Sequence, residues 1–158
     1  MGLDMYLSVR KNISRVKSWD YSNGPITSPE FEKAAEATGM SKWEEPESIY
    51  GLEVQAVAAY WRKQNAIHNW FVKNVQKGQD DCGEYYVGRD KLTELRDLCH
   101  KILNDRTKVN ELPTASGFFF GSVEYDEYYF NDLTDTVRII DNALALPKSW
   151  GFYYSSSW

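Results

Sequence analysis

The sequence predicts an α+β fold, in which about four helices pack on a small antiparallel sheet. Three observations support this class. Apolar and polar residues alternate at the start of the chain, apolar residues recur with helical spacing in several later stretches, and the tail is rich in residues that favour strands. The chain has 158 residues and shows neither an internal repeat nor a linker, so we expect residues 1–158 to form a single domain.

A half-buried strand is predicted for residues 3–9, where apolar and polar side chains alternate. Neighbouring residues of a strand point to opposite faces, so the alternation separates a core side from an outer side. The expected orientations are Leu3, Met5, Leu7 and Val9 inward, and Asp4, Tyr6 and Ser8 outward.

A short helix is predicted for residues 29–38. Ser28 can act as the N-cap, and Pro29 fits the first helical position because the N–H that proline lacks would have no partner there. Gly39 is expected to end the helix, since glycine adopts the left-handed backbone conformation without strain.

Residues 47–78 fit two patterns. Alternation over residues 52–60 indicates a strand, whereas apolar residues also recur with helical spacing through much of the segment. A single helix of that length would be unusual in a domain of this size. We therefore expect a strand over 52–60 and a helix over 62–76, ended by Gly78.

The second half of the chain is predicted to contain two further helices and a final strand. Apolar stripes predict the helices over 89–104 and 125–146. Between them, residues 112–117 are expected to form a loop that leads into a buried turn or short strand at 118–121. The tail at 150–154 favours a strand and can pair with the first strand.

Composition argues against several classes of function. The formal net charge of −5 and the isoelectric point near 5.1 disfavour a nucleic-acid-binding surface. No apolar run approaches the roughly 20 residues that a membrane helix needs. Cys82 and Cys99 are too few for a disulfide scaffold, so we expect a cytoplasmic setting, with Cys99 in the core. With two histidines and no phosphate-binding glycine motif, neither a metal nor a cofactor is expected.

The most informative segment for function is 60–71. If residues 60–71 are helical, Trp61, Asn65 and His68 follow i, i+4, i+7 spacing and share one face, with Arg62 beside it. A ring for stacking, a guanidinium for phosphate and polar side chains suit an anionic or planar ligand. The alternative is a solvated helix face whose Trp61 packs under a neighbouring loop.

A second candidate site is the acidic stretch before a short predicted strand. Asp80 and Asp81 precede Gly83, and with a further carboxylate they could bind a divalent cation, although the spacing matches no calcium loop. The alternative is an acidic turn in which a carboxylate caps a neighbour. Tyr85 and Tyr86 alternate on the strand, so we expect one to be inside and the other available to a ligand.

A third candidate site precedes the last helix. The carboxylates of Glu124 and Asp126 complement the positive N-terminal end of that helix. Together with Tyr128 they could form a polar wall facing Arg62 or Lys63. The alternative is a salt bridge from Asp126 to Arg62 or Lys63 that docks two helices.

These clusters carry a resemblance that spans nearly the whole chain. The motifs are MGLDMYL at residues 1–7, YWRK at 60–63 with AIH at 66–68 and WFV at 70–72, GFFFG at 117–121, and EYDEYYF at 124–130. On these motifs the chain resembles a family of small proteins from tailed phages and prophages. The resemblance implies a phage genome and the cytoplasm of an infected bacterium as the setting, with counter-defence as one role, and it implies no reaction.

The leading functional hypothesis is a non-catalytic phage protein that sequesters a small anionic, nucleotide-like ligand in an aromatic-lined pocket. Cationic side chains would bind the phosphate of the ligand, and aromatic rings would stack on its planar group. Polar side chains would form hydrogen bonds with the edges of that group. The predicted ligand-binding residues are Trp61, Arg62, Lys63, Asn65, His68, Tyr85, Tyr86 and Asp126.

Two alternatives remain open. An exposed patch of Tyr and Trp would fit a protein that binds and inhibits a host protein. A small hydrolase would use His68 as general base, with Asp80, Asp81 or Asp126 as acid or metal ligand. Exposed aromatic residues would also fit a homo-oligomer.

Overall fold

A computed structural model describes residues 2–117 and 120–158. The chain divides into two compact units: a larger unit of Met1–Val9 with Ala56–Trp158, and a smaller unit of Arg10–Gln55. Each unit has its own buried apolar cluster. The predicted α+β class is confirmed. The expectation of a single domain over residues 1–158 stays a prediction.

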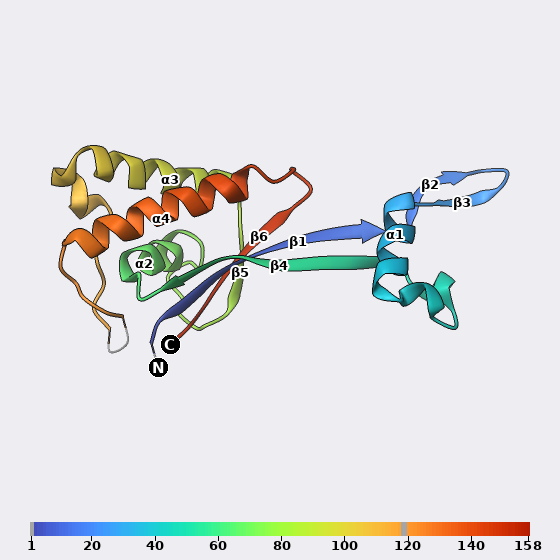
Figure 1. Ribbon diagram of the computed structural model, residues 1–158, viewed down its shortest axis with the longest axis horizontal. Coiled ribbons are helices and arrows are strands. Elements are labelled where there is room, and N and C mark those ends of the chain that lie inside the picture. The colour runs from blue at the N-terminus through green and yellow to red at the C-terminus, as the bar shows by residue number, and fades with distance from the viewer. Residues whose placement is uncertain (1, 118–119) are drawn as a thin grey trace. The chain divides into compact units, whose positions relative to one another are not determined.

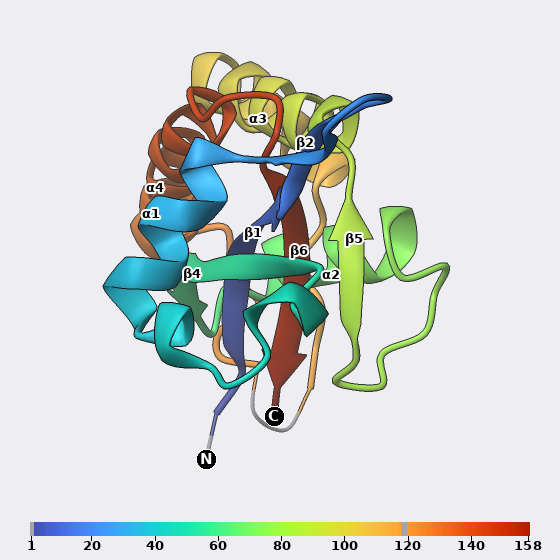
Figure 2. The ribbon, with the colours of Figure 1, turned by 90° about the vertical axis from the view of Figure 1, so that its right-hand side faces the viewer.

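The larger unit contains a four-stranded antiparallel sheet with the strand order β4-β1-β6-β5 (Figure 1). The strands are β1 (Asp4–Ser14), β4 (Gly51–Arg62), β5 (Glu84–Val87) and β6 (Gly151–Ser157), and β1 and β4 run on into the smaller unit. The C-terminal strand lies between β1 and β5 (Figure 2), so the predicted pairing of the tail with the first strand is confirmed.

The predicted orientation of the first strand is largely confirmed. The four apolar residues are at most 4% exposed: Leu3, Met5, Leu7 and Val9. Ser8 is the exception, because its side chain is buried although the alternation places it outside. Since β1 is an interior strand, flanked by β4 and β6, its neighbours shield a side chain as small as that of serine.

The strand predicted over 52–60 is confirmed, but it extends further than expected. The backbone N–H of Lys63 donates to the Leu3 carbonyl over 2.8 Å and so continues the contact with the first strand. Lys63 then adopts a left-handed conformation with φ of 58°, which turns the chain. Helix α2 therefore spans Asn65–Asn74 and begins three residues later than expected.

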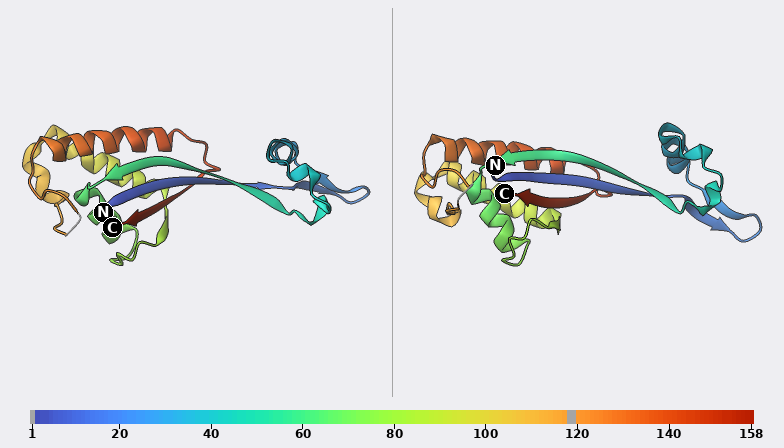
Figure 3. Two further views of the ribbon diagram at one scale, coloured as in Figure 1. Left: turned by 60° about the horizontal axis from the view of Figure 1, so that its bottom comes forward. Right: turned by 90° about the horizontal axis from the view of Figure 1, so that it is seen from below.

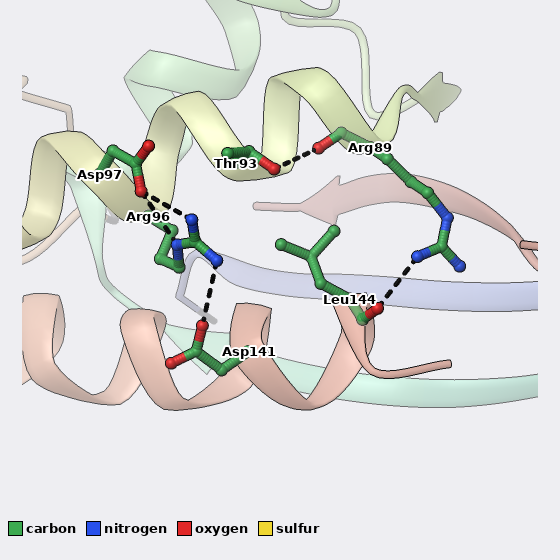
Figure 4. A network of polar contacts seen from close by, with 6 residues as sticks. All are labelled: Arg89, Thr93, Arg96, Asp97, Asp141 and Leu144. Atoms are coloured by element: carbon green, nitrogen blue, oxygen red, sulfur yellow. Dashed lines mark hydrogen bonds and ion pairs between the residues drawn. The ribbon is translucent and has the colours of Figure 1, made fainter. Parts of the chain in front are cut away.

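Two long helices pack side by side along the sheet of the larger unit (Figures 1 and 3). Helix α3 spans Arg89–Asn104, as predicted, and α4 spans Glu127–Leu144, two residues shorter at each end than expected. Figure 4 shows how their polar faces meet: the Arg96 guanidinium lies 3.4 Å from the Asp141 carboxylate, and Arg89 donates to the Leu144 carbonyl over 3.0 Å.

The smaller unit is built around helix α1, which spans Pro29–Thr38 as predicted. The backbone N–H of Phe31 donates to the Ser28 side chain over 3.5 Å, and Gly39 ends the helix with φ of 77°. Ile13, Phe31 and Ala35 form the small core of this unit.

Several elements of the structure were not predicted. The smaller unit contains a hairpin of β2 (Val16–Asp20) and β3 (Gly24–Thr27) and two short 3₁₀ turns, Met40–Lys42 and Pro46–Ser48. A third 3₁₀ turn, Arg106–Glu111, follows α3. Of the turn or short strand expected at 118–121, residues 118–119 lie outside the described residues. No helix among the described residues has the length and apolar character needed to cross a membrane.

Candidate functional site

A cavity of about 270 Å³ lies in the larger unit where the end of β4, the start of α2, the loop before α4 and the first turns of α4 meet. Four of the eight predicted ligand-binding residues line it: Arg62, Lys63, Asn65 and Asp126. Trp61, His68, Tyr85 and Tyr86 do not line it. The structure therefore brings half of the predicted site together.

One wall of the cavity is cationic. Arg62 keeps 61% of its side chain exposed and lies 3.9 Å from Asp4, its ion-pair partner. Lys63 has no ion pair within the described part of the chain. Helix α2 begins beside these side chains without a side-chain cap from Gln64 and without an acidic residue in its first turn. The N–H of Asn65 donates to the Lys63 carbonyl over 3.0 Å, so the positive end of the helix comes from the N–H groups that follow it.

The predicted polar wall is present, but the predicted salt bridge is not. Glu124, Asp126 and Tyr128 line the cavity together with Arg62 and Lys63. The Asp126 carboxylate accepts hydrogen bonds from the backbone N–H groups of Tyr128 and Tyr129, so it caps α4. No ion pair joins Asp126 to Arg62 or Lys63 among the residues described here.

Asn65 fixes the loop over the cavity and is 4% exposed. Its side-chain NH₂ donates to the carbonyls of Phe120 and Ser122 over 3.0 and 2.7 Å, and its oxygen accepts from the N–H of Ala115 over 3.0 Å. Both ends of the Asn65 amide are therefore bonded to backbone, and its role in reading a ligand edge stays a prediction.

Trp61 was predicted to stack on a ligand, and the structure contradicts this. The residue lies on β4 rather than on a helix, its ring faces the core, and it is 1% exposed. The indole N–H donates to the Thr136 hydroxyl over 3.2 Å. The helical spacing that linked Trp61 to Asn65 and His68 does not exist, because the helix begins only at Asn65.

His68 is also buried, at 1% exposure, and cannot reach a ligand in the cavity. Its Nδ1 lies 2.7 Å from the Tyr154 hydroxyl, and its Nε2 lies 3.0 Å from Oδ2 of Asp80. The other Asp80 oxygen accepts from the Trp158 indole over 3.1 Å. The imidazole thus joins α2, the following loop and β6, and burial of Tyr154 raises the pKa of its hydroxyl well above the usual value.

The stretch around Tyr85 and Tyr86 does not line the cavity. The predicted alternation is confirmed: Tyr85 is partly buried, and Tyr86 is 63% exposed. Asp81 accepts from the N–H of Gly83 and from the Tyr85 hydroxyl, which agrees with the acidic-turn alternative. No group of three or more potential metal ligands occurs within the described ranges.

The sequence interpretation missed Asp132, which lines the cavity from the second turn of α4. Burial raises the pKa of Asp132 to about 7, and the nearby charges of Asp135 and Asp126 add to the shift, while a hydrogen bond from Gln64 opposes it. A signal was present, since Asp132 directly precedes Leu133 and lies one turn after Tyr128. It therefore borders the apolar stripe of the predicted helix.

Replacing Asp132 with Asn is expected to stabilise the protein above neutral pH. The folded state keeps Asp132 protonated up to a pKa of about 7, whereas the unfolded chain releases that proton near pH 3.8. The stabilisation that wild type gains from keeping this proton on Asp132 is therefore fully present below about pH 4, and it is lost as the pH rises through 7. Between pH 4 and pH 8 we expect wild type to lose about 1–2 kcal/mol of unfolding free energy relative to Asp132→Asn.

Urea denaturation at several pH values measures this difference. Glu94→Gln is the matched control, because its carboxylate lies on α3 with 51% of the side chain exposed. A difference between wild type and Asp132→Asn that does not change with pH would contradict the prediction.

No protein-family model, curated protein or solved structure matches this chain. The resemblance to small phage proteins therefore stays a prediction that depends on the sequence motifs. The case for function depends on the chemistry of the cavity.

Proposed function

We propose that this chain is a phage-encoded, non-catalytic binding protein that sequesters a small anionic, nucleotide-like ligand in the cytoplasm of the infected bacterium. The observation that carries the proposal is the meeting of Arg62, Lys63 and the uncapped start of α2 in one cavity. A counter-defence role rests on the resemblance to phage proteins.

The cationic wall supports an anionic ligand. A hydrogen bond between a charged donor and a phosphate is typically worth about 1.5–3 kcal/mol. Helix N-termini bind phosphate through their free N–H groups and positive dipole. The backbone of Gly121, with φ of 87°, passes close to Lys63. A Cβ at this position would lie 3.2 Å from the Cβ of Lys63. A glycine at this position therefore lets the loop approach the lysine.

An exposed ring at the cavity supports a planar group on the ligand. Tyr128 lines the cavity and is 79% exposed, whereas Tyr129 is 5% exposed and packs in the core. Stacking of a base on an aromatic ring contributes about 1–3 kcal/mol. The volume of about 270 Å³ lies just below the usual range of roughly 300–1,000 Å³ for ligand pockets, which favours a ligand of mononucleotide size.

The cavity lining supports binding without catalysis. It contains neither of the two histidines and neither of the two cysteines. Burial raises the pKa of the Cys99 thiol to about 12, so the reactive thiolate is scarce at neutral pH. A preformed site with charged and aromatic contacts can bind tightly without any chemical step.

The proposal is tested by titrating the purified chain with linear and cyclic nucleotides in a calorimeter. The double variant Arg62→Gln with Lys63→Gln is expected to bind at least about 150-fold more weakly, because loss of two contacts of at least about 1.5 kcal/mol each removes about 3 kcal/mol or more. The ligand should be recovered intact after heat denaturation of the complex.

The matched control replaces two exposed lysines of the larger unit that do not line the cavity, Lys73→Gln with Lys148→Gln. This variant is expected to keep wild-type affinity. Absence of binding by every nucleotide, or equal binding by both double variants, would overturn the proposal.

A second candidate, binding of a host protein, is supported by the smaller unit. Four of its aromatic side chains are between 57% and 100% exposed: Trp19, Tyr21, Trp43 and Tyr50. Tyr and Trp are enriched among the residues that dominate protein interfaces. A pull-down from bacterial lysate distinguishes this function from small-ligand binding.

A further inference from the structure

The cavity contains a half-buried carboxylate without a cationic partner. Asp132 is partly buried on α4 and forms no ion pair with any residue that the structure describes. The carboxylates of Asp135 on α4 and of Asp126 at its N-cap lie nearby and disfavour the ionised form of Asp132. Such a group gains stability from a ligand that brings N–H donors, because an ionised carboxylate can only accept hydrogen bonds.

Gln64 fixes the surroundings of this carboxylate. The Gln64 side chain is 9% exposed, and its oxygen lies 3.4 Å from the Thr136 hydroxyl. Its amide therefore keeps the NH₂ group for Asp132, to which it is hydrogen bonded. One N–H donor leaves most of the accepting capacity of a carboxylate free, since its two oxygens offer about four lone-pair sites.

The charged groups around Asp132 come from three segments. Arg62 and Lys63 come from the end of β4 and the turn after it, Glu124 and the N-cap residue Asp126 from the segment before α4, and Asp135 from α4 itself. The cations of the cavity lining thus come from one segment of the chain, and the carboxylates come from others. This arrangement favours a ligand with an anionic group and, at a different position, nitrogen donors.

We propose, on the basis of the proposed function, that Asp132 selects guanine among the bases of a bound nucleotide. The carboxylate accepts hydrogen bonds from the adjacent N1–H and N2–H groups of guanine, while Arg62 and Lys63 contact the phosphate. Hypoxanthine offers only one of the two donors. Xanthine places a carbonyl oxygen where guanine has its amino group, and adenine places a ring nitrogen with a lone pair against the carboxylate. Binding of these bases is expected to be weaker, because the Asp132 carboxylate would lose a hydrogen-bond donor in the complex.

The experiment compares binding of GMP, IMP and XMP by calorimetry at pH 8, where Asp132 is ionised. Wild type is expected to bind GMP at least tenfold more tightly than IMP, and IMP more tightly than XMP. In Asp132→Asn the order of GMP and XMP is expected to reverse, because the amide NH₂ of asparagine donates to the xanthine carbonyl and repels the guanine amino group. Asp135→Asn, at an exposed position of α4 outside the cavity lining, should keep the wild-type order.

A second readout is the pH dependence of binding. Protonation of Asp132 removes an acceptor, so the affinity of wild type for GMP should fall about tenfold more than that of Asp132→Asn between pH 8 and pH 6. The phosphate of GMP titrates in the same way with both proteins, so its effect cancels when the affinity of wild type is divided by that of Asp132→Asn at each pH.

The outcomes separate the two proposals. If wild type binds GMP, IMP and XMP equally, or if Asp132→Asn keeps the wild-type order, selection of guanine by Asp132 is overturned while nucleotide binding stands. If none of the three nucleotides binds and the wider nucleotide panel also fails, both proposals are overturned.

Discussion

Trp61→Ala is expected to lower the free energy of unfolding by about 3–5 kcal/mol, the usual cost of removing a large aromatic side chain from a core. Trp61 is among the largest fully buried side chains and packs against Phe71, with the two ring centroids 6.0 Å apart. The truncation also leaves the Thr136 hydroxyl without its indole donor. Urea denaturation followed by circular dichroism measures the change.

Two control variants separate a core role from a ligand-binding role. Trp19→Ala removes an indole that is 63% exposed, and it should change stability by no more than about 0.5 kcal/mol. Trp61→Phe keeps a ring in the core, and it should retain nucleotide affinity in the folded protein. A Trp61→Phe variant of wild-type stability that no longer binds nucleotide would contradict the assignment of Trp61 to the core.

His68→Ala is expected to lower the free energy of unfolding by about 2–4 kcal/mol. The change creates a cavity and removes the partner of the Tyr154 hydroxyl and of the Asp80 carboxylate. A buried polar group that loses its partner costs about 1–3 kcal/mol, and the loss of packed volume adds to this. The same denaturation measurement applies.

His100→Ala is the matched control, because His100 is the other histidine of the chain and is exposed on α3. It should leave stability unchanged within about 0.5 kcal/mol. A His68→Ala variant with wild-type stability would show that the hydrogen bonds of the imidazole do not hold the fold, and it would reopen the hydrolase alternative.

Most of the secondary structure could be predicted because it depends on local signals. The helix at 89–104 follows from an apolar stripe of regular period, and the helix at 29–38 follows from its two caps. The hairpin at Val16–Thr27 was missed, although the turn at its tip was visible, because its strands carry mostly exposed side chains without clear alternation.

The candidate site was only half predictable. Arg62 and Lys63 were predicted because cationic side chains near aromatic residues suit a ligand that carries phosphate. Both residues line the cavity whether or not helix α2 begins where it was expected. The orientation of Trp61 did depend on the helix boundary, and the boundary is set by the left-handed backbone of Lys63, which no sequence signal announces for a lysine. Asp132 gains its properties from tertiary neighbours such as Gln64, so local patterns could not single it out.

The interior place of β6 in the sheet bears on how the protein is made. One of the two hydrogen-bonded neighbours of β1 is β6, which is synthesised more than a hundred residues later, at residues 151–157. At roughly 5–20 residues per second, one side of β1 waits on the order of ten seconds for this neighbour. Contacts between such distant parts of a chain slow folding. Between the synthesis of β1 and that of β6, one edge of β1 is therefore open to chaperones.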